Sequence, residues 1–289
     1  DFRLGLSATP ERQYDPDGTR VLFDFFGDPV FEFTLKEAIN VCLVPYNYYM
    51  YQVPLTDEEY EDWLALTEIV RKIGGLSDLD TSDSPKMEKN AEMLLFKRRR
   101  IIESAQAKIP MLRQILGQRD KDEIKHALVY ATDKNREQLI EVNRMLQHDL
   151  GLVIHEVTAR QTSKGKIAPD ILRRFAEGEY NALTCMRVLD EGVDVPQVSE
   201  AFLLASNTVK RQWIQRRGRV LRKCDAIGKK IAHLHDFIVV PPNPGDSAAR
   251  SLLNSEIQRA NEFAELAENG AEPGGSFEQL NELMEKMFN

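Results

Sequence analysis

Four arginines lie within the stretch QWIQRRGRVLR, Gln212 to Arg222, of a chain whose formal net charge is −8. If this stretch is a helix, one stripe of its surface carries two amides and two guanidinium groups, from Gln212, Gln215, Arg219 and Arg222. Planar guanidinium groups match phosphate oxygens and neutralise the charge that develops during phosphoryl transfer. A surface helix stabilised by salt bridges would carry the same residue types, and this segment alone favours that simpler interpretation.

The remaining residues of the stretch refine this interpretation. A glycine in a helix interior costs about 1 kcal/mol relative to alanine, so Gly218 indicates that another group approaches the backbone closely there. Arg217 points toward the apolar side of the helix and is expected to need a carboxylate partner or a position at the rim. We therefore expect Arg216 and Arg217 to hold the helix in place or to border a nucleic acid.

A second segment, RVLDEGVDVP (187–196), follows a predicted buried strand. Ligands of parallel sheets bind at the carboxyl ends of the strands, so Glu191 and Asp194 are candidates for such a site. Asp194 could accept a hydrogen bond from a ribose hydroxyl or orient an arginine, and Gly192 permits a sharp turn or a close backbone contact. An ordinary acidic turn explains the segment equally well when it is taken alone.

The elements that must position these residues follow from the pattern of apolar residues. Short apolar runs alternate with helical patterns between residues 119 and 245, and the predicted strands are 126–132, 151–158, 181–189, 199–205 and 230–240. Strands separated by helices specify a parallel sheet with helices on both faces, so the predicted fold class is α/β.

Helical patterns dominate the segments before and after this region. Residues 56–116 have helical periodicity and begin with Thr56 as a cap and acidic residues in the first turn. Residues 246–289 are expected to form two amphipathic helices. Near the beginning, residues 2–10 are expected to form a strand that ends in a Ser-Ala-Thr-Pro turn, and residues 29–39 an extended segment that leads into a short helix.

Composition excludes several classes of protein. With 289 residues, 42% hydrophobic and 29% charged, the chain is long enough and apolar enough to bury a core. Its three cysteines have neither the spacing of a disulfide framework nor that of a zinc site, so we expect no metal ligands and a reducing, cytoplasmic setting. No apolar run reaches membrane-spanning length, so no membrane partner is expected. Residues 210–230 hold nine Lys or Arg and one acidic residue, which gives an acidic chain a local surface for nucleic acid.

Taken together, these motifs resemble a known family. Ser7-Ala8-Thr9, RVLDEGVDVP and QRRGRVLR, in this order, resemble motifs III, V and VI of superfamily 2 helicases and translocases, with HALVYAT (126–132) in the place of motif IV. The sequences DEGVDVP and QRRGRVLR are most similar to those of the XPB-type and UvrB-like DNA helicase branch. The resemblance covers about residues 4–240, and its most specific part is the pattern Gln215, Gly218, Arg219 and Arg222.

The resemblance implies a RecA-like fold and a role for each matching residue. In this family a second RecA-like domain closes over ATP and Mg²⁺ bound by a first, and its last motif VI arginine, here Arg222, acts as the arginine finger with Arg219 assisting. The implied nucleotide-binding residues are Gln215, Gly192, Asp194 and Glu191. The implied residues for coupling hydrolysis to nucleic-acid binding are Ser7, Ala8 and Thr9. The implied nucleic-acid contacts are Thr132, Thr158, Arg160 and Arg187.

The resemblance also implies a division of the chain. Residues 1–12 would end the first RecA-like lobe, 13–45 would be a connector and 46–118 a helical insertion. Residues 119–245 would be the second RecA-like domain, followed by C-terminal helices at 246–289.

Two departures from the family pattern bear on function. No G-x-x-x-x-G-K-[ST] sequence occurs, so the lysine loop that binds phosphates is expected upstream of residue 1, and the fragment alone is expected not to hydrolyse ATP. Met186 stands where relatives often carry a threonine that contacts a phosphate, so main-chain N–H groups are expected to make that contact instead.

The resulting prediction is the C-terminal motor half of an ATP-dependent DNA helicase or translocase. Its expected partners are DNA, an N-terminal lobe of the same protein and possible further subunits. A non-catalytic nucleic-acid-binding or assembly module with the same fold is the alternative. A small-molecule nucleotide enzyme is disfavoured, because no glycine-rich loop follows the first strand of the α/β region.

Overall fold

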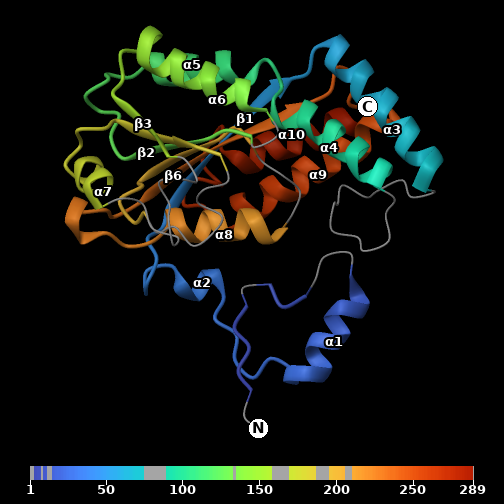
Figure 1. Ribbon diagram of the computed structural model, residues 1–289, viewed down its shortest axis with the longest axis horizontal. Coiled ribbons are helices and arrows are strands. Elements are labelled where there is room, and N and C mark those ends of the chain that lie inside the picture. The colour runs from blue at the N-terminus through green and yellow to red at the C-terminus, as the bar shows by residue number, and fades with distance from the viewer. Residues whose placement is uncertain are drawn as a thin grey trace.

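The structure, a computed structural model, describes residues 3–7, 9–11, 15–74, 89–132, 135–157, 169–186, 195–205 and 210–288. Within these residues the strands form one six-stranded parallel sheet with the order β1-β6-β5-β2-β4-β3 (Figure 1). The strands are β1 Tyr46–Pro54, β2 Ala127–Tyr130, β3 Ile154–Val157, β4 Ala182–Cys185, β5 Glu200–Leu203 and β6 Ala232–Val240.

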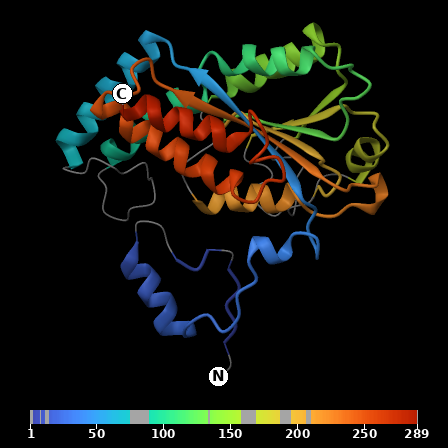
Figure 2. The ribbon, with the colours of Figure 1, turned by 180° about the vertical axis from the view of Figure 1, so that it is seen from behind.

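Helices cover both faces of the sheet, as Figures 1 and 2 show. The helices are α1 Pro16–Phe26, α2 Leu35–Ala38, α3 Asp57–Gly74, α4 Lys89–Glu103, α5 Lys108–Gly117, α6 Arg136–Arg144, α7 Pro169–Ala176, α8 Lys210–Val220, α9 Ser247–Ala264 and α10 Ser276–Phe288. One apolar core joins the sheet to α7, α8, α9 and α10, and a second joins it to α3, α5 and α6. This arrangement confirms the predicted α/β class.

The strand β1 corrects the expected boundary of the helical insertion. Residues 46–54 pair in parallel with β6 along their whole length and form an edge of the sheet. Tyr46 and Tyr48 are buried in the first core, and Val53 in the second. Tyrosine and valine favour strands. Because a capped helix follows directly, the sequence pattern assigned these residues to the helical insertion.

The helical region itself forms as its sequence predicts. Thr56 accepts a hydrogen bond from the Glu59 N–H at 3.1 Å, and the Glu59 carboxylate accepts from the Thr56 N–H at 3.0 Å, which makes a capping box. Trp63 and Tyr60 stack with ring centroids 6.2 Å apart, and both are buried. Both belong to the second core and pack α3 onto the rest of the molecule.

The first residues of the chain lie apart from the sheet (Figures 1 and 2). Arg3–Ser7 form no strand within the described residues, contrary to the expectation for this segment. The helix α1 was not foreseen, and it has no buried residue. Thr34 and Glu37 form the capping box that begins the predicted short helix, α2.

Candidate functional site

The arginine helix α8 is anchored by Arg216, whose side chain is buried. Its Nη1 donates a hydrogen bond to the Ala205 carbonyl at 2.7 Å, and its guanidinium lies over the Tyr130 ring, 4.9 Å from the centroid. Ala205 follows β5 and Tyr130 ends β2. Arg216 therefore ties α8 to the carboxyl ends of two central strands.

Arg217 anchors the same helix on its other side. Its Nη1 donates to the Glu262 carbonyl at 2.7 Å and to the Tyr46 hydroxyl at 3.5 Å, and its guanidinium lies 4.9 Å from the Phe263 ring centroid. These contacts are a carbonyl, a phenol and an aromatic face, and the side chain is buried rather than at the rim that the sequence offered as one alternative. The expectation that Arg216 and Arg217 hold the helix in place is confirmed.

Arg219 and Arg222 have solvent-accessible side chains, but they do not share one helical stripe. The helix ends at Val220, so Arg222 lies two residues beyond it. There the Val44 N–H donates to the Leu221 carbonyl at 2.8 Å, and Leu43 forms an isolated bridge with Arg222. The backbone of Arg222 is thus fixed by the segment that leads into β1, which sequence spacing could not show.

Lys229 joins the end of α8 to another segment of the site. Its Nζ donates to the carbonyls of Val220, Val198 and Pro196, the last two at 2.5 and 3.3 Å. Burial lowers its pKa to about 8. Because Pro196 and Val198 directly follow the acidic segment 187–194, Lys229 is a positioning residue that the basic run alone did not single out.

Several predicted site residues lie outside the described residues. These are Ala8, Thr158, Arg160, Arg187, Glu191, Gly192 and Asp194. The side chain of Gln215 is also outside them, although its backbone belongs to α8. Because β2, β4 and β5 are adjacent and parallel, their carboxyl ends lie at the same edge of the sheet, which is where α8 is anchored.

The other predicted residues lie in different surroundings. Ser7 is exposed and its hydroxyl accepts a hydrogen bond from the Thr9 N–H at 3.1 Å, so these two form a local turn. Thr132 is fully buried, and its hydroxyl is hydrogen-bonded to the Glu103 carboxylate. A direct contact from this hydroxyl to nucleic acid does not agree with that burial. Met186, directly after β4, is half-buried, and Thr184 within β4 has no exposed surface.

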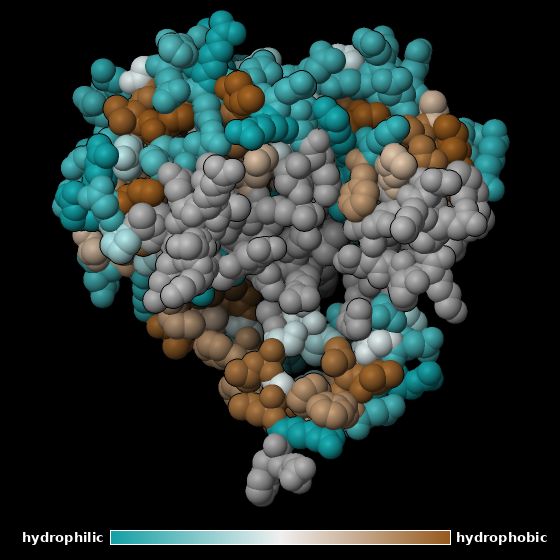
Figure 3. Space-filling model, viewed as in Figure 1, coloured by the Kyte–Doolittle hydropathy of each residue, from teal (hydrophilic) through white to brown (hydrophobic). Residues whose placement is uncertain are grey.

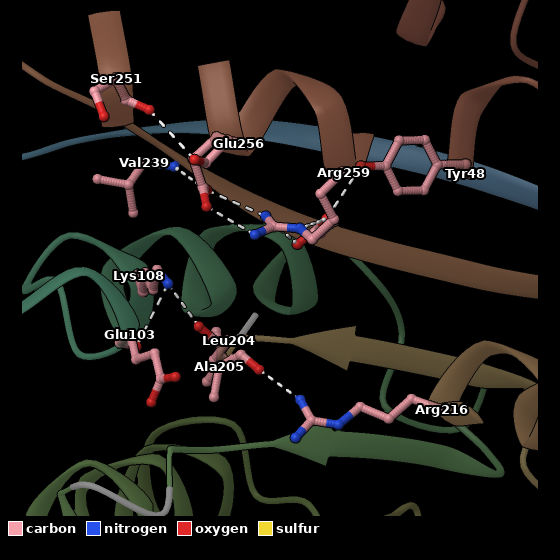
Figure 4. A network of polar contacts seen from close by, with 12 residues as sticks. Tyr48, Glu103, Lys108, Leu204, Ala205, Arg216, Val239, Ser251, Glu256 and Arg259 are labelled. Carbon is pink, nitrogen blue, oxygen red and sulfur yellow. Dashed lines mark hydrogen bonds and ion pairs between the residues drawn. The ribbon is translucent and has the colours of Figure 1, made fainter. Parts of the chain in front are cut away.

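A buried polar layer lies beside this edge of the sheet (Figure 4). The Lys108 Nζ donates to the Leu204 carbonyl at 2.6 Å and to the Glu103 carbonyl at 3.4 Å. Burial lowers the pKa of Lys108 to about 8, and Glu256, Asp236 and Glu103 oppose that shift while Arg259 adds to it. The lysine is therefore an ionisable group held in the core.

The lowered pKa of Lys108 predicts a dependence of stability on pH. Between about pH 8 and 10.5 the unfolded chain keeps this proton and the native state loses it, so the free energy of unfolding rises with pH. From pH 8 to 9.5 we expect Lys108 to contribute an increase of about 1.5 kcal/mol. Lys229 has a similar pKa and contributes separately. In denaturant unfolding, the free energy of unfolding of Lys108→Met should therefore rise between pH 8 and 9.5 by about 1.5 kcal/mol less than that of the wild type. An equal rise in the two proteins would contradict this prediction.

Gly218 lies in α8 with nothing within 4 Å of the place where a Cβ would be. Gly218→Ala should therefore stabilise the chain by roughly 0.5–1 kcal/mol, through helix propensity alone. Thermal unfolding of Gly218→Ala measures this gain, and a variant no more stable than the wild type would contradict it.

These features define an α/β domain that carries a half-buried Arg219 and an exposed Arg222 on an anchored segment at the carboxyl ends of its central strands. Residues 107–224 match the family described as the helicase conserved C-terminal domain. This match covers the region that holds α5, α8 and the central strands, and it marks residues 107–224 as similar to a helicase C-terminal domain.

Individual proteins show the same relationship. The DNA 3'-5' translocase XPB2 of Sulfurisphaera tokodaii is 29% identical over 237 residues, which is 78% of this chain and 50% of that protein. The UvrABC system protein B of Serratia proteamaculans is 31% identical over 121 residues, or 40% of this chain and 17% of that protein. This chain thus spans half the length of the first relative.

Among solved structures, the Hef helicase domain of Pyrococcus furiosus is similar with a TM-score of 0.46 and 19% identity. The similarity covers 81% of this chain and 63% of the Hef chain.

Among the described residues, no helix has both the length and the apolar character needed to cross a membrane. The same residues contain no cluster of His, Cys, Asp or Glu that could hold a metal ion.

Proposed function

We propose that this chain is the C-terminal motor half of an ATP-dependent DNA helicase or translocase. The observation that carries the proposal is the difference in burial among the four arginines of residues 216–222. Arg216 and Arg217 are buried and fix α8, whereas Arg219 is half-buried and Arg222 is exposed, and a Cβ added at Gly218 between them would have nothing within 4 Å. A purely structural helix would not need this separation.

In this proposal the accessible arginines bind the phosphates of ATP. Arg222 contacts the γ-phosphate and stabilises the charge of the transition state, and Arg219 assists it. Mg²⁺ bound with ATP would neutralise charge on the β- and γ-phosphate oxygens. The backbone contact with Leu43 and the carbonyl bonds of Lys229 hold the two arginines at the end of α8. Gln215, Glu191, Gly192 and Asp194 complete the nucleotide site.

A complementary lobe of the same protein supplies the phosphate-binding loop and the Mg²⁺ ligands. The apolar side chains of residues 3–33 support such a lobe, because they are exposed: Leu4, Leu6, Val21, Phe25, Phe26, Val30, Phe31 and Phe33. Figure 3 shows apolar groups gathered over this lower part of the molecule. An apolar surface of this kind marks an interaction site. We propose that the first lobe covers it and that Ser7, Ala8 and Thr9 link the two lobes.

DNA is the proposed nucleic acid, in a reducing, cytoplasmic setting. Thr158, Arg160 and Arg187 follow strands at the carboxyl edge of the sheet and are the proposed phosphate contacts. Because Thr132 is buried against Glu103, we assign it to support of that edge. Contacts to further protein subunits belong to the same proposal, and the surface of α9 and α10 that faces away from the sheet is available for them.

The test compares ATP hydrolysis by the complete protein and by residues 1–289, each with and without DNA. We expect DNA-stimulated hydrolysis from the complete protein and none from residues 1–289 alone. DNA binding by the complete protein without any hydrolysis would support a non-catalytic module instead.

A further inference from the structure

Two buried cations from different helices bind adjacent carbonyl groups at the carboxyl end of β5. Lys108, the first residue of α5, donates to the Leu204 carbonyl at 2.6 Å. Arg216, on α8, donates to the Ala205 carbonyl at 2.7 Å. Both side chains are less than one-tenth exposed. Figure 4 shows them approaching neighbouring residues of one strand end from two directions.

The contacts of Lys108 continue to the end of α4. Its Nζ reaches the Glu103 carbonyl at 3.4 Å, and the same carbonyl accepts from Gln138 Nε2 at 3.0 Å. The Glu103 carboxylate is hydrogen-bonded to the Thr132 hydroxyl, and the Thr132 N–H donates to Gln138 Oε1 at 2.8 Å. The end of α4 is therefore joined to the residues that follow β2 and to those that follow β5.

The arrangement is a costly way to pack a core. A buried charge stabilises a fold less than an apolar side chain of similar volume. Burial without specific bonds would favour leucine or methionine at position 108, because the cost of desolvation would be avoided. Unlike an apolar side chain, the ammonium group makes a directional hydrogen bond. It holds the Leu204 carbonyl in place, as Arg216 holds the Ala205 carbonyl. A displacement of α5 relative to α8 must lengthen at least one of these bonds.

We propose that Lys108 is a positioning residue for the arginine helix, and that it couples the α4–α5 pair to α8 through the carbonyl groups of Leu204 and Ala205. Contacts made by α4, which lies beside α3, then change the position of Arg219 and Arg222. The effect on turnover rests on the proposed function, whereas the coupling between the helices does not.

The first experiment measures amide hydrogen exchange in the complete protein. Lys108→Met should make the amides of residues 210–222 exchange about tenfold faster, the effect of losing one charge-assisted hydrogen bond at the support of α8. The amides of β3 and α7, at the far side of the sheet, should not change. Arg119→Met is the matched control, because Arg119 binds Glu200 at the opposite end of β5 at 2.6 Å. That control should leave residues 210–222 unchanged.

The second experiment separates positioning from a general loss of structure. Lys108→Met should lower kcat for DNA-stimulated ATP hydrolysis about tenfold and leave the KM for ATP within about twofold. Arg119→Met should change neither constant. If Lys108→Met does not fold, Thr132→Val takes its place, because it keeps the shape of the side chain and removes the bond to Glu103.

The outcomes are distinct. Faster exchange of residues 210–222, with β3 and α7 unchanged and with the drop in kcat, supports the proposal. Exchange that increases evenly along the chain, or that leaves residues 210–222 unchanged, overturns it. A wild-type protein without ATP hydrolysis overturns the proposed function, while the exchange experiment still decides whether Lys108 couples the helices.

Discussion

Arg222→Ala should abolish DNA-stimulated ATP hydrolysis by the complete protein and leave its fold intact. An arginine that stabilises the transition state of phosphoryl transfer contributes about 10³-fold or more to kcat, and we expect a loss of at least that size. The fold should survive because Arg222 is exposed and the backbone around it is held by the bridge to Leu43 and by the Val44–Leu221 hydrogen bond. The measurement is steady-state hydrolysis at saturating ATP and DNA, with circular dichroism to check folding.

Two further variants make this result specific to the guanidinium group. Arg222→Lys keeps a positive charge but loses the planar fork, so it should recover only a small part of the activity. Arg113→Ala is the control, because Arg113 is another exposed arginine, on α5, whose side chain pairs with Asp149 at 3.2 Å. This variant should keep full activity. Turnover by Arg222→Ala at the wild-type rate would refute the role of Arg222 as arginine finger and with it the catalytic proposal.

The sequence predicted most of the sheet, because buried parallel strands are short apolar runs separated by helices. It missed β1, whose residues Tyr46–Pro54 alternate between buried and half-buried positions and contain a glutamine and an asparagine. A strand at the edge of a sheet needs only one neighbour, so its pattern carries less information than that of a central strand. β1 also pairs with a strand that is distant in the sequence: Tyr48 of β1 and Asp236 of β6, whose side chains are hydrogen-bonded, are 188 residues apart.

The candidate site was predicted in part. Residue types and spacing separated Arg216 and Arg217 from Arg219 and Arg222, and the burial of the first two agrees with that separation. Helical periodicity failed at Arg222, because the helix ends at Val220 and residues 43–44 then direct the chain. The sequence did not identify Lys108 and Lys229 as part of the site. Their partners are backbone carbonyls of distant residues, and every residue type has such a carbonyl, so no residue pattern indicates the contact. The role of residues 187–194 stays a prediction.

A second buried cluster is expected to control the stability of the whole chain. Arg259 on α9 is 2% exposed and lies beside Glu256 of its own helix (Figure 4), and it also pairs with Asp236 of β6. Its Nε is 3.2 Å from the Asp236 carboxylate, and its Nη1 is 2.7 Å from the Glu256 carboxylate. Tyr48 on β1 also donates to Asp236, at 3.1 Å. The cluster therefore holds α9 against the two strands at the edge of the sheet.

Arg259→Met should lower the free energy of unfolding by roughly 3–5 kcal/mol, because it leaves two carboxylates buried without their cation. The loss should come from this imbalance of charge rather than from lost volume. Arg259→Met combined with Asp236→Asn and Glu256→Gln should then recover at least half of it. Arg250→Met, an exposed arginine of the same helix, should change the free energy by less than about 1 kcal/mol. Chemical denaturation of the four proteins measures these differences. If the triple variant were less stable than Arg259→Met, the cluster would act through its hydrogen-bond geometry and not through its charge balance.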